Sequence, residues 1–141
     1  MPARSRLFLL AFALITLALA IFPIGWLGEI WHPFGGWLWR VFPNAWAHAA
    51  GHIAIFGLVG LAALFAFPSL RTKLWLYFTL ILAAGIAQEF FQLLYKQRSI
   101  VRDDFRDLGT DLIGAALAFL IVRYLLPNLL LARLALKSQN R

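Results

Sequence analysis

Hydrophobic residues fall into long runs that are separated by short polar segments. A helix of about 20 residues is needed to cross the hydrocarbon core of a bilayer. Residues 7–27, 46–68 and 74–95 reach this length, and Glu89 is the one Asp, Glu, Lys or Arg residue that they contain. Each of these three runs is therefore predicted to form one membrane-spanning helix.

A fourth run is shorter, because its uncharged part covers only residues 112–122. It reaches spanning length as 108–126 if Asp111 lies one turn inside the membrane and Arg123 extends its charged group to the far surface. With this run included, the predicted fold is an all-α integral membrane four-helix bundle that forms a single domain, residues 1–141.

Two segments outside the runs are predicted to lie at the membrane surface. Five of the six tryptophans cluster around residues 28–45, and tryptophan favours the headgroup level of a bilayer. We expect an interfacial Trp-rich loop there, with a short amphipathic helix around residues 37–42. Residues 127–141 combine leucines with Arg133 and Lys137, which predicts a basic amphipathic tail on the cytoplasmic surface.

Composition supports a membrane protein and excludes several other classes. Hydrophobic residues make up 62% of the chain and charged residues 13%, whereas soluble domains contain about 45–50% and about 25%. The formal net charge of +7 comes mainly from Lys and Arg residues that flank the apolar runs, where they meet anionic lipid headgroups. Membrane lipids are therefore the expected partners, and nucleic acid is not. The absence of cysteine excludes disulfides and thiolate metal sites.

Basic residues also predict the orientation in the membrane. With a cytoplasmic N-terminus, that side carries eight of the 13 Lys and Arg residues. Cytoplasmic segments are enriched in Lys and Arg, so both termini are predicted to be cytoplasmic. The five basic residues on the outer side are Arg40, Lys96, Arg98, Arg102 and Arg106.

Polar residues inside the runs recur at helical spacing and lie toward the outer end of each run. His48 and His52 are four residues apart, and Glu89 and Gln92 are three apart, so each pair shares one helix face. Polar groups inside a membrane are costly and mark functional sites, so we expect one polar pocket that opens toward the outer leaflet. A third stripe lines this pocket and three arginines form its rim: Asp104, Asp107, Asp111 and Gly114, with Arg98, Arg102 and Arg106.

Structural explanations compete with functional ones at these positions. His48 suits an interfacial residue near a helix end, and Glu89 suits a salt bridge with Arg98 or His52. His48 and His52 together with Glu89 also offer ligands for zinc, although no metal or other cofactor is expected. Four small residues on the last run predict close helix packing: Gly109, Gly114, Ala115 and Ala118.

Residues 46–122 resemble the VanZ-like family of small membrane proteins. The founding member of this family is associated with resistance to the glycopeptide teicoplanin, and no reaction is established for the family. The resemblance implies a protein of the cell envelope in the bacterial inner membrane. The matching residues are His52-x-x-x-Phe56, Glu89-x-x-Gln92, an arginine at Arg98, and Asp107-x-x-x-Asp111-x-x-Gly114.

The chain departs from the family pattern at three places. Family members often carry an Asp-Lys pair before the histidine, whereas this chain has His48 and Ala49 there. Asp111 stands at the usual asparagine of the family. The segment before the last motif is longer than is typical, so either Arg98 or Arg102 corresponds to the motif arginine.

The expected function is to bind or process a lipid-linked or lipoglycopeptide-type amphiphile at the outer leaflet. If a reaction is catalysed, the expected catalytic residues are Glu89, His52 and Asp107, which supply an acid or a base. The alternative is an accessory or structural role in an oligomer or a larger membrane complex, without catalysis. The residues expected to bind the substrate are Gln92, Arg98, Arg102 and Asp111.

Overall fold

A computed structural model describes residues 3–127 of the chain, and no strand occurs within this range. Of the predicted tail 127–141, all but Pro127 lies outside the described residues. Six α-helices, one 3-10 turn and one π turn follow one another along the chain: α1 (Ala3–Ile21), α2 (Ile24–Ile30), α3 (His32–Val41), α4 (Ala45–Ala66), η1 (Pro68–Arg71), α5 (Leu74–Lys96), α6 (Arg102–Leu120) and η2 (Ile121–Leu125).

Four of these helices are long and apolar enough to cross a membrane. The 22 residues of α4, for example, extend over about 33 Å at the rise of an α-helix. Large apolar side chains are also exposed, among them Phe8, Trp75 and Phe105, as expected for a surface that contacts lipid. The prediction of an all-α membrane protein is thus supported. The four candidate spans are Arg4–Ile21, Ala45–Ala66, Leu74–Lys96 and Arg102–Leu125.

Two helix boundaries differ from the predicted spans. The run 7–27 is divided, because α1 ends at Ile21 and α2 begins after Pro23; the residue before a proline disfavours the α conformation. The last long helix begins at Arg102, six residues earlier than predicted. Its first turn is stabilised because the Asp104 carboxylate accepts a hydrogen bond from the backbone N–H of Val101 at 2.8 Å.

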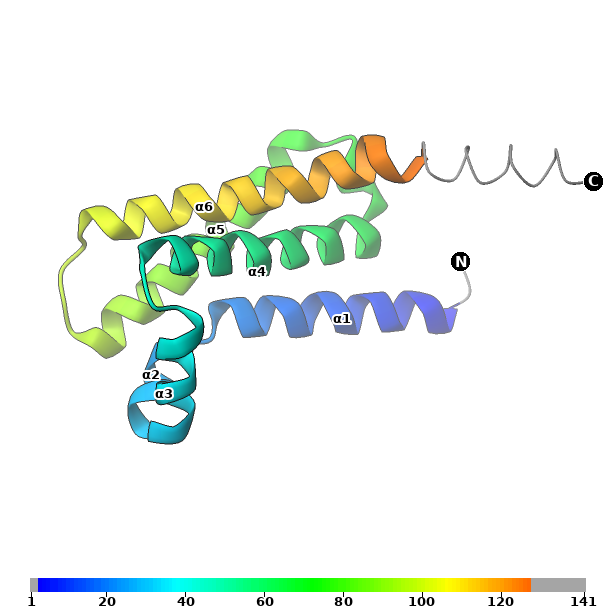
Figure 1. Cartoon of the computed structure of the whole chain (residues 1–141). Coiled ribbons are helices and arrows are strands. Elements are labelled where there is room, and N and C mark those ends of the chain that lie inside the picture. The colour runs from blue at the N-terminus through cyan, green and yellow to red at the C-terminus, as the bar shows by residue number, and fades with distance from the viewer. Residues whose placement is uncertain (1–2, 128–141) are drawn as a thin grey trace, which may run out of the picture.

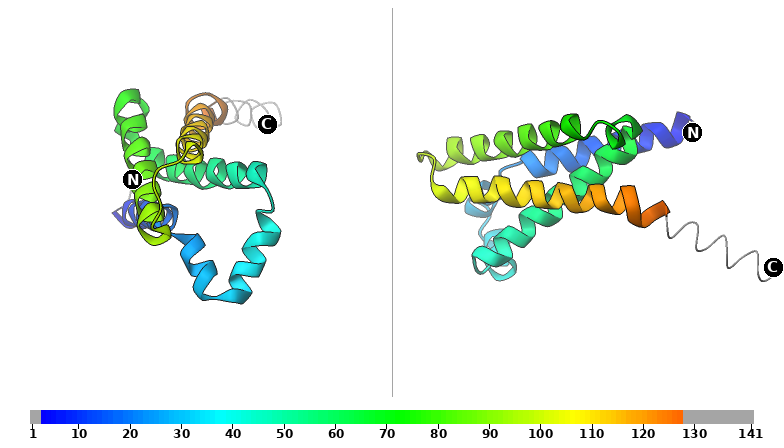
Figure 2. Two further views of the ribbon diagram at one scale, coloured as in Figure 1. Left: turned by 90° about the vertical axis from the view of Figure 1, so that its left-hand side faces the viewer. Right: turned by 90° about the horizontal axis from the view of Figure 1, so that it is seen from above.

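The four long helices lie side by side, and the shorter α2 and α3 form a hairpin at one end of them (Figures 1 and 2). The helix α4 packs against α6 and α1, and α5 packs against the same two helices. The start of α1 and the end of α6 lie at the opposite end from this hairpin (Figure 1). The Trp-rich segment is therefore helical, and its Trp31, Phe34 and Trp37 rings stack with centroids 5.7 Å apart.

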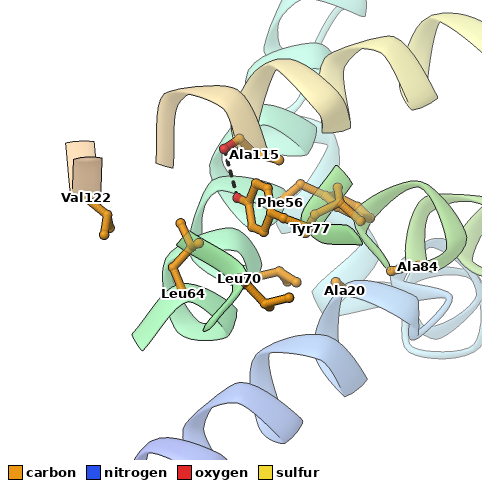
Figure 3. Packing of buried hydrophobic residues seen from close by; sticks show 10 residues of the cluster. Ala20, Phe56, Leu64, Leu70, Tyr77, Ala84, Ala115 and Val122 are labelled. Carbon is orange, nitrogen blue, oxygen red and sulfur yellow. Dashed lines mark hydrogen bonds between the residues drawn. The ribbon is translucent and has the colours of Figure 1, made fainter. Parts of the chain in front are cut away.

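Close contact between α4 and α6 is the feature that positions the polar residues. A Cβ atom added at Gly114 would collide with the carbonyl oxygen of Ile53 and would lie 2.9 Å from the backbone nitrogen of Gly57. At the next residue of α6, the Tyr77 hydroxyl donates to the carbonyl oxygen of Ala115 at 2.8 Å (Figure 3). The two backbones can approach this closely only because glycine occupies the crossing point.

Candidate functional site

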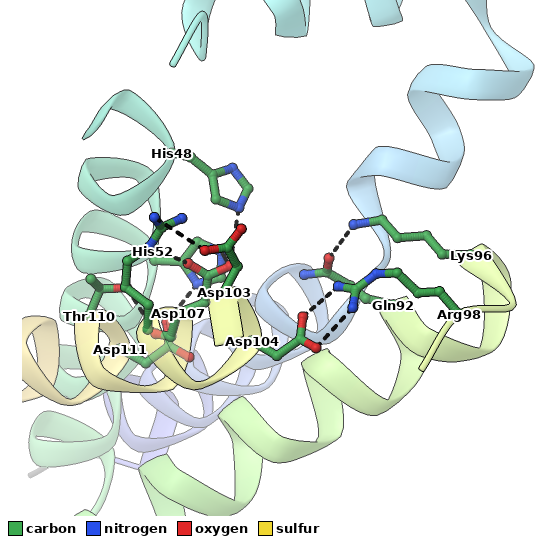
Figure 4. A network of polar contacts seen from close by, with 11 residues as sticks. His48, His52, Gln92, Lys96, Arg98, Asp103, Asp104, Asp107, Thr110 and Asp111 are labelled. Atoms are coloured by element: carbon green, nitrogen blue, oxygen red, sulfur yellow. Dashed lines mark hydrogen bonds and ion pairs between the residues drawn. The ribbon is translucent and has the colours of Figure 1, made fainter. Parts of the chain in front are cut away.

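A buried histidine and a buried aspartate join α4 to α6. His52 Nδ1 and Asp111 Oδ1 are 2.8 Å apart, and both side chains are almost completely buried (Figure 4). His52 lies two turns into α4. Asp111 lies one turn before Gly114, on the face of α6 that packs against α4. A charge-assisted hydrogen bond of this kind is short and strong in a low-dielectric environment. The pair therefore fixes both the position and the orientation of the His52 ring.

A second pair of contacts extends this site toward the surface. His48 Nε2 lies 3.5 Å from Asp107 Oδ2, and His52 Nε2 lies 3.8 Å from the same oxygen. The side chain of His48 is 47% exposed, whereas that of Asp107 is 8% exposed. Figure 4 shows the His48 ring pointing toward Asp107. His48 is thus the most exposed of these side chains. We call these four residues the His-Asp cluster: His48, His52, Asp107 and Asp111.

The segment between α5 and α6 is held by an ion pair. Two guanidinium nitrogens of Arg98 contact the two carboxylate oxygens of Asp104, one of them at 2.9 Å. The hydrogen bond with Asp104 raises the pKa of the Arg98 guanidinium above its ordinary value, so this cation is permanent. Arg106 lies farther out, 3.4 Å from Asp103 and 3.9 Å from Asp107. Arg98 therefore ties the start of α6 to the end of α5.

Glu89 reaches the site from α5 without a direct partner. Its side chain is buried, and neither carboxylate oxygen has a hydrogen-bond donor among residues 3–127. One turn before it on α5, a Cβ added at Gly85 would lie 2.8 Å from Asp111 Oδ2, so Glu89 faces the same polar region. Its neighbour Asp104 offers acceptor oxygens only. The predicted carboxylate thus lies beside the His-Asp cluster and not within it.

Two predicted binding residues point elsewhere. Gln92 accepts a hydrogen bond from Lys96 at 2.8 Å, one turn along α5. The side chain of Arg102 is exposed and makes no hydrogen bond or ion pair with another residue of the described range 3–127. The spacing of His48 and His52 correctly placed both rings on one face of the same helix. It did not predict that His48 contacts Asp107.

The polar residues are packed together and do not line a wide pocket. His52, Asp107 and Asp111 are each at most 6% exposed, since they fill the space between α4 and α6 with one another. A groove lies on the surface between α5 and α6, and the residues of α6 that line it begin directly after Asp111 in the sequence. Its lining is almost wholly apolar: Phe78, Thr79, Leu82, Leu112, Ile113 and Ala116.

Three side chains offer metal-ligand atoms that lie close together. The atoms come from His48, His52 and Asp107 and all lie within 4.8 Å of one another. The third member is Asp107, whereas the sequence had suggested Glu89. Imidazole nitrogen and carboxylate oxygen are ligands that zinc accepts.

Comparisons with models of protein families, with curated proteins and with solved structures find no match for this chain. The resemblance to the VanZ-like family therefore stays a prediction.

Proposed function

We propose that this chain is a VanZ-like protein of the cell envelope, built as a membrane four-helix bundle, that binds the polar headgroup of an amphiphile at its His-Asp cluster. The observation that carries the proposal is the meeting of four ionisable side chains from two candidate spans at one end of the helices. Such groups are expensive inside a membrane and are retained there for function.

The surroundings of the cluster suit an amphiphile. The apolar groove on the surface between α5 and α6 is lined by Leu112 and Ile113, the two residues after Asp111, and we place the acyl chain of the amphiphile there. At the same end of the molecule, the α2–α3 hairpin exposes Trp31, Trp37 and Trp39. Tryptophan favours the headgroup level, so this hairpin would lie in the outer membrane interface. A lipid-linked molecule or a lipoglycopeptide of the teicoplanin type has the required polar and acyl parts.

The location proposed is the inner membrane of a bacterium with both termini in the cytoplasm. The basis is the excess of Lys and Arg on the side of the N-terminus. The cluster then faces the outer leaflet, where lipid-linked envelope precursors and glycopeptides are met.

Binding is better supported than catalysis. A reaction would use Glu89 as acid or base, with His52 and Asp107 beside it. Within residues 3–127, however, no serine belongs to a candidate span other than Ser5 near the start of α1. A serine nucleophile would therefore have to come from elsewhere. The buried hydroxyl of Thr110 donates to the backbone carbonyl oxygen of Asp107 at 2.8 Å and not to His52.

Native mass spectrometry of the chain after gentle extraction from its membrane tests the proposal. We expect a polyisoprenoid-linked or similarly large amphiphile to remain bound to the wild-type protein, and to be depleted in His48→Ala. His32→Ala, which changes an exposed histidine of α3, is the matched control and should retain the amphiphile. Bulk phospholipid in membrane proportions on all three proteins would contradict the proposal.

A direct ligand assay separates the two kinds of amphiphile. The protein in lipid nanodiscs is titrated with a teicoplanin-type lipoglycopeptide and with the same glycopeptide core lacking its acyl chain. Saturable binding of the acylated compound alone supports a lipoglycopeptide ligand. Binding of neither compound, together with a retained lipid-linked molecule in native mass spectra, identifies the envelope lipid as the ligand.

One observation favours the accessory role as a second candidate. The His52–Asp111 and Arg98–Asp104 pairs each link two elements of the fold, so they also serve packing. In that role the protein would be extracted as a complex with other subunits and without a bound amphiphile, an outcome that the same native mass spectra report.

A further inference from the structure

Three acceptor atoms converge at the exposed end of the His-Asp cluster. Asp107 Oδ2 lies 3.5 Å from His48 Nε2 and 3.8 Å from His52 Nε2. The two imidazole rings face the same oxygen from consecutive turns of α4, with centroids 4.8 Å apart. The other oxygen of Asp107 is buried and has no hydrogen-bond donor among the described residues. The two Nε2 atoms and Asp107 Oδ2 therefore surround one small region with atoms that can act as ligands.

The hydrogen bond to Asp111 determines which nitrogen of His52 is available. An ionised Asp111 only accepts hydrogen bonds, so with this carboxylate ionised the contact of 2.8 Å places a proton on Nδ1 of His52. In the neutral ring, Nε2 then carries a lone pair and points toward Asp107. The lone pair of His52 Nε2 and Asp107 Oδ2 then face each other at 3.8 Å, and a cation bound between them would remove their repulsion.

We propose that His48, His52 and Asp107 bind one divalent transition-metal ion, zinc in the first place, through the two Nε2 atoms and a carboxylate oxygen, with Asp111 as the residue that orients His52. A histidine ligand to a metal almost always donates its second ring N–H to a carboxylate or carbonyl. The His52–Asp111 pair already has this geometry. Because both histidines present the same nitrogen, they can act as ligands from one helix face.

The distances are close to those of a zinc site. Ligand atoms that lie about 2.0–2.2 Å from a tetrahedral zinc are about 3.4 Å from one another. The three candidate atoms lie within 4.8 Å, so small rotations of the side chains bring them to this spacing. His48 is half exposed and leaves the fourth position accessible from outside the helices. Three protein ligands with an open position are typical of zinc that binds an exchangeable oxygen ligand.

The metal site does not rest on the proposed amphiphile. A bound zinc would accept a phosphate or carboxylate oxygen of a headgroup, but the ion is expected to bind in the absence of any amphiphile. The competing occupant of the same point is a proton, which would convert one imidazole into a cation. Measuring metal binding distinguishes these two occupants directly.

The test uses the whole chain in lipid nanodiscs, purified with a tag that contains no histidine. The protein has no cysteine, so thiolate binding does not interfere. After dialysis against zinc and then against buffer, elemental analysis should give one zinc per chain in the wild type. His48→Gln and Asp107→Asn should lose stoichiometric zinc, and Asp111→Asn should bind about 10–100-fold more weakly, as expected for a residue that orients a ligand.

Two controls separate the site from adventitious binding. His32→Gln removes the one other histidine, and Asp103→Asn removes an acid that is 69% exposed on the same helix as Asp107. Both variants should retain one zinc per chain. Loss of zinc from either control, with retention in His48→Gln, would assign the binding to surface groups and overturn the proposal.

Cobalt provides a second measurement that does not depend on stoichiometry. Co²⁺ in a site of low symmetry with nitrogen and oxygen ligands shows visible ligand-field bands that are stronger than those of the hydrated ion. We expect these bands in the wild type and in His32→Gln, and their loss in His48→Gln. His48 is half exposed, so its replacement should leave the fold intact even if the Asp107 and Asp111 variants fail to fold. No saturable binding of zinc or cobalt by the wild type would overturn the proposal and leave the proton as the occupant.

Discussion

At the scale of single residues, Arg98 and Arg102 differ in a way that the sequence left open. Arg98 forms a two-point contact with the buried Asp104, whereas Arg102 is exposed. Removing Arg98 leaves the buried Asp104 carboxylate without its cationic partner. The cost is reduced because the Arg98 side chain is 30% exposed, so water screens part of the interaction. We expect Arg98→Ala to lower the free energy of unfolding by about 2 kcal/mol, measured by denaturant unfolding in detergent micelles.

Arg102→Ala is the matched control, because it removes the same side chain from the same region. Its effect should stay within about 0.5 kcal/mol, as for most surface substitutions. Equal destabilisation by the two variants would show that Asp104 does not depend on Arg98. A stability loss in Arg102→Ala alone would instead assign the structural role to Arg102.

The sequence predicted the residues of the cluster better than it predicted their partners. Helical spacing placed His48 with His52 and Asp107 with Asp111, because this spacing depends on local geometry alone. It did not identify Arg98 as the partner of Asp104. That pairing depends on the turn after α5, where Gln97 adopts a left-handed conformation with φ of 47°. A non-glycine residue in this conformation is uncommon, so helical spacing does not reveal this turn.

At the scale of helices, two glycines of α6 make opposite predictions. Gly114 contacts the backbone of α4, so a Cβ at this position forces α4 and α6 apart. Gly109 has no atom within 4 Å of the position where a Cβ would be. Gly114→Ala should destabilise the protein by about 1–3 kcal/mol. Gly109→Ala should stabilise it by up to about 1 kcal/mol, because alanine has the higher helix propensity. Thermal unfolding in micelles measures both effects.

The glycine pair also tests whether the helix crossing positions the cluster. The histidines lie on α4 and their aspartate partners on α6, so Gly114→Ala should weaken zinc binding as well as stability. Gly109→Ala should leave zinc binding unchanged. A Gly114→Ala protein with normal zinc affinity would show that the cluster tolerates separation of the two helices.

Helix boundaries were predictable where the apolar run was continuous. The predicted spans 46–68 and 74–95 match α4 and α5 to within two residues at each end. The run 7–27 contains Pro23, and its uniform hydrophobicity hid the break that this proline causes. The early start of α6 depends on Asp104, whose carboxylate accepts the Val101 N–H.

At the scale of the whole molecule, the starts of α4 and α6, which carry the His-Asp cluster, lie at the opposite end of the long helices from the start of α1 (Figure 1). Four spans place the two ends of the described chain on one side of the membrane. The turn between α4 and α5 belongs to that same side, and the turn between α5 and α6 belongs to the side of the cluster. The orientation therefore decides whether the cluster meets the cytoplasm or the outer leaflet, and with it the kind of amphiphile that can reach it.

Single cysteines introduced into this cysteine-free chain report the orientation directly. Ser99 lies in the turn between α5 and α6, Ser69 lies in η1, and both are exposed. With cytoplasmic termini, a membrane-impermeant maleimide should label Ser99→Cys in intact spheroplasts and should label Ser69→Cys only after permeabilisation. The physical reason is the excess of Lys and Arg on the side of Ser69. The reverse pattern would place the cluster in the cytoplasm, where glycopeptides do not reach, and would leave the zinc proposal standing while removing the proposed outer-leaflet ligand.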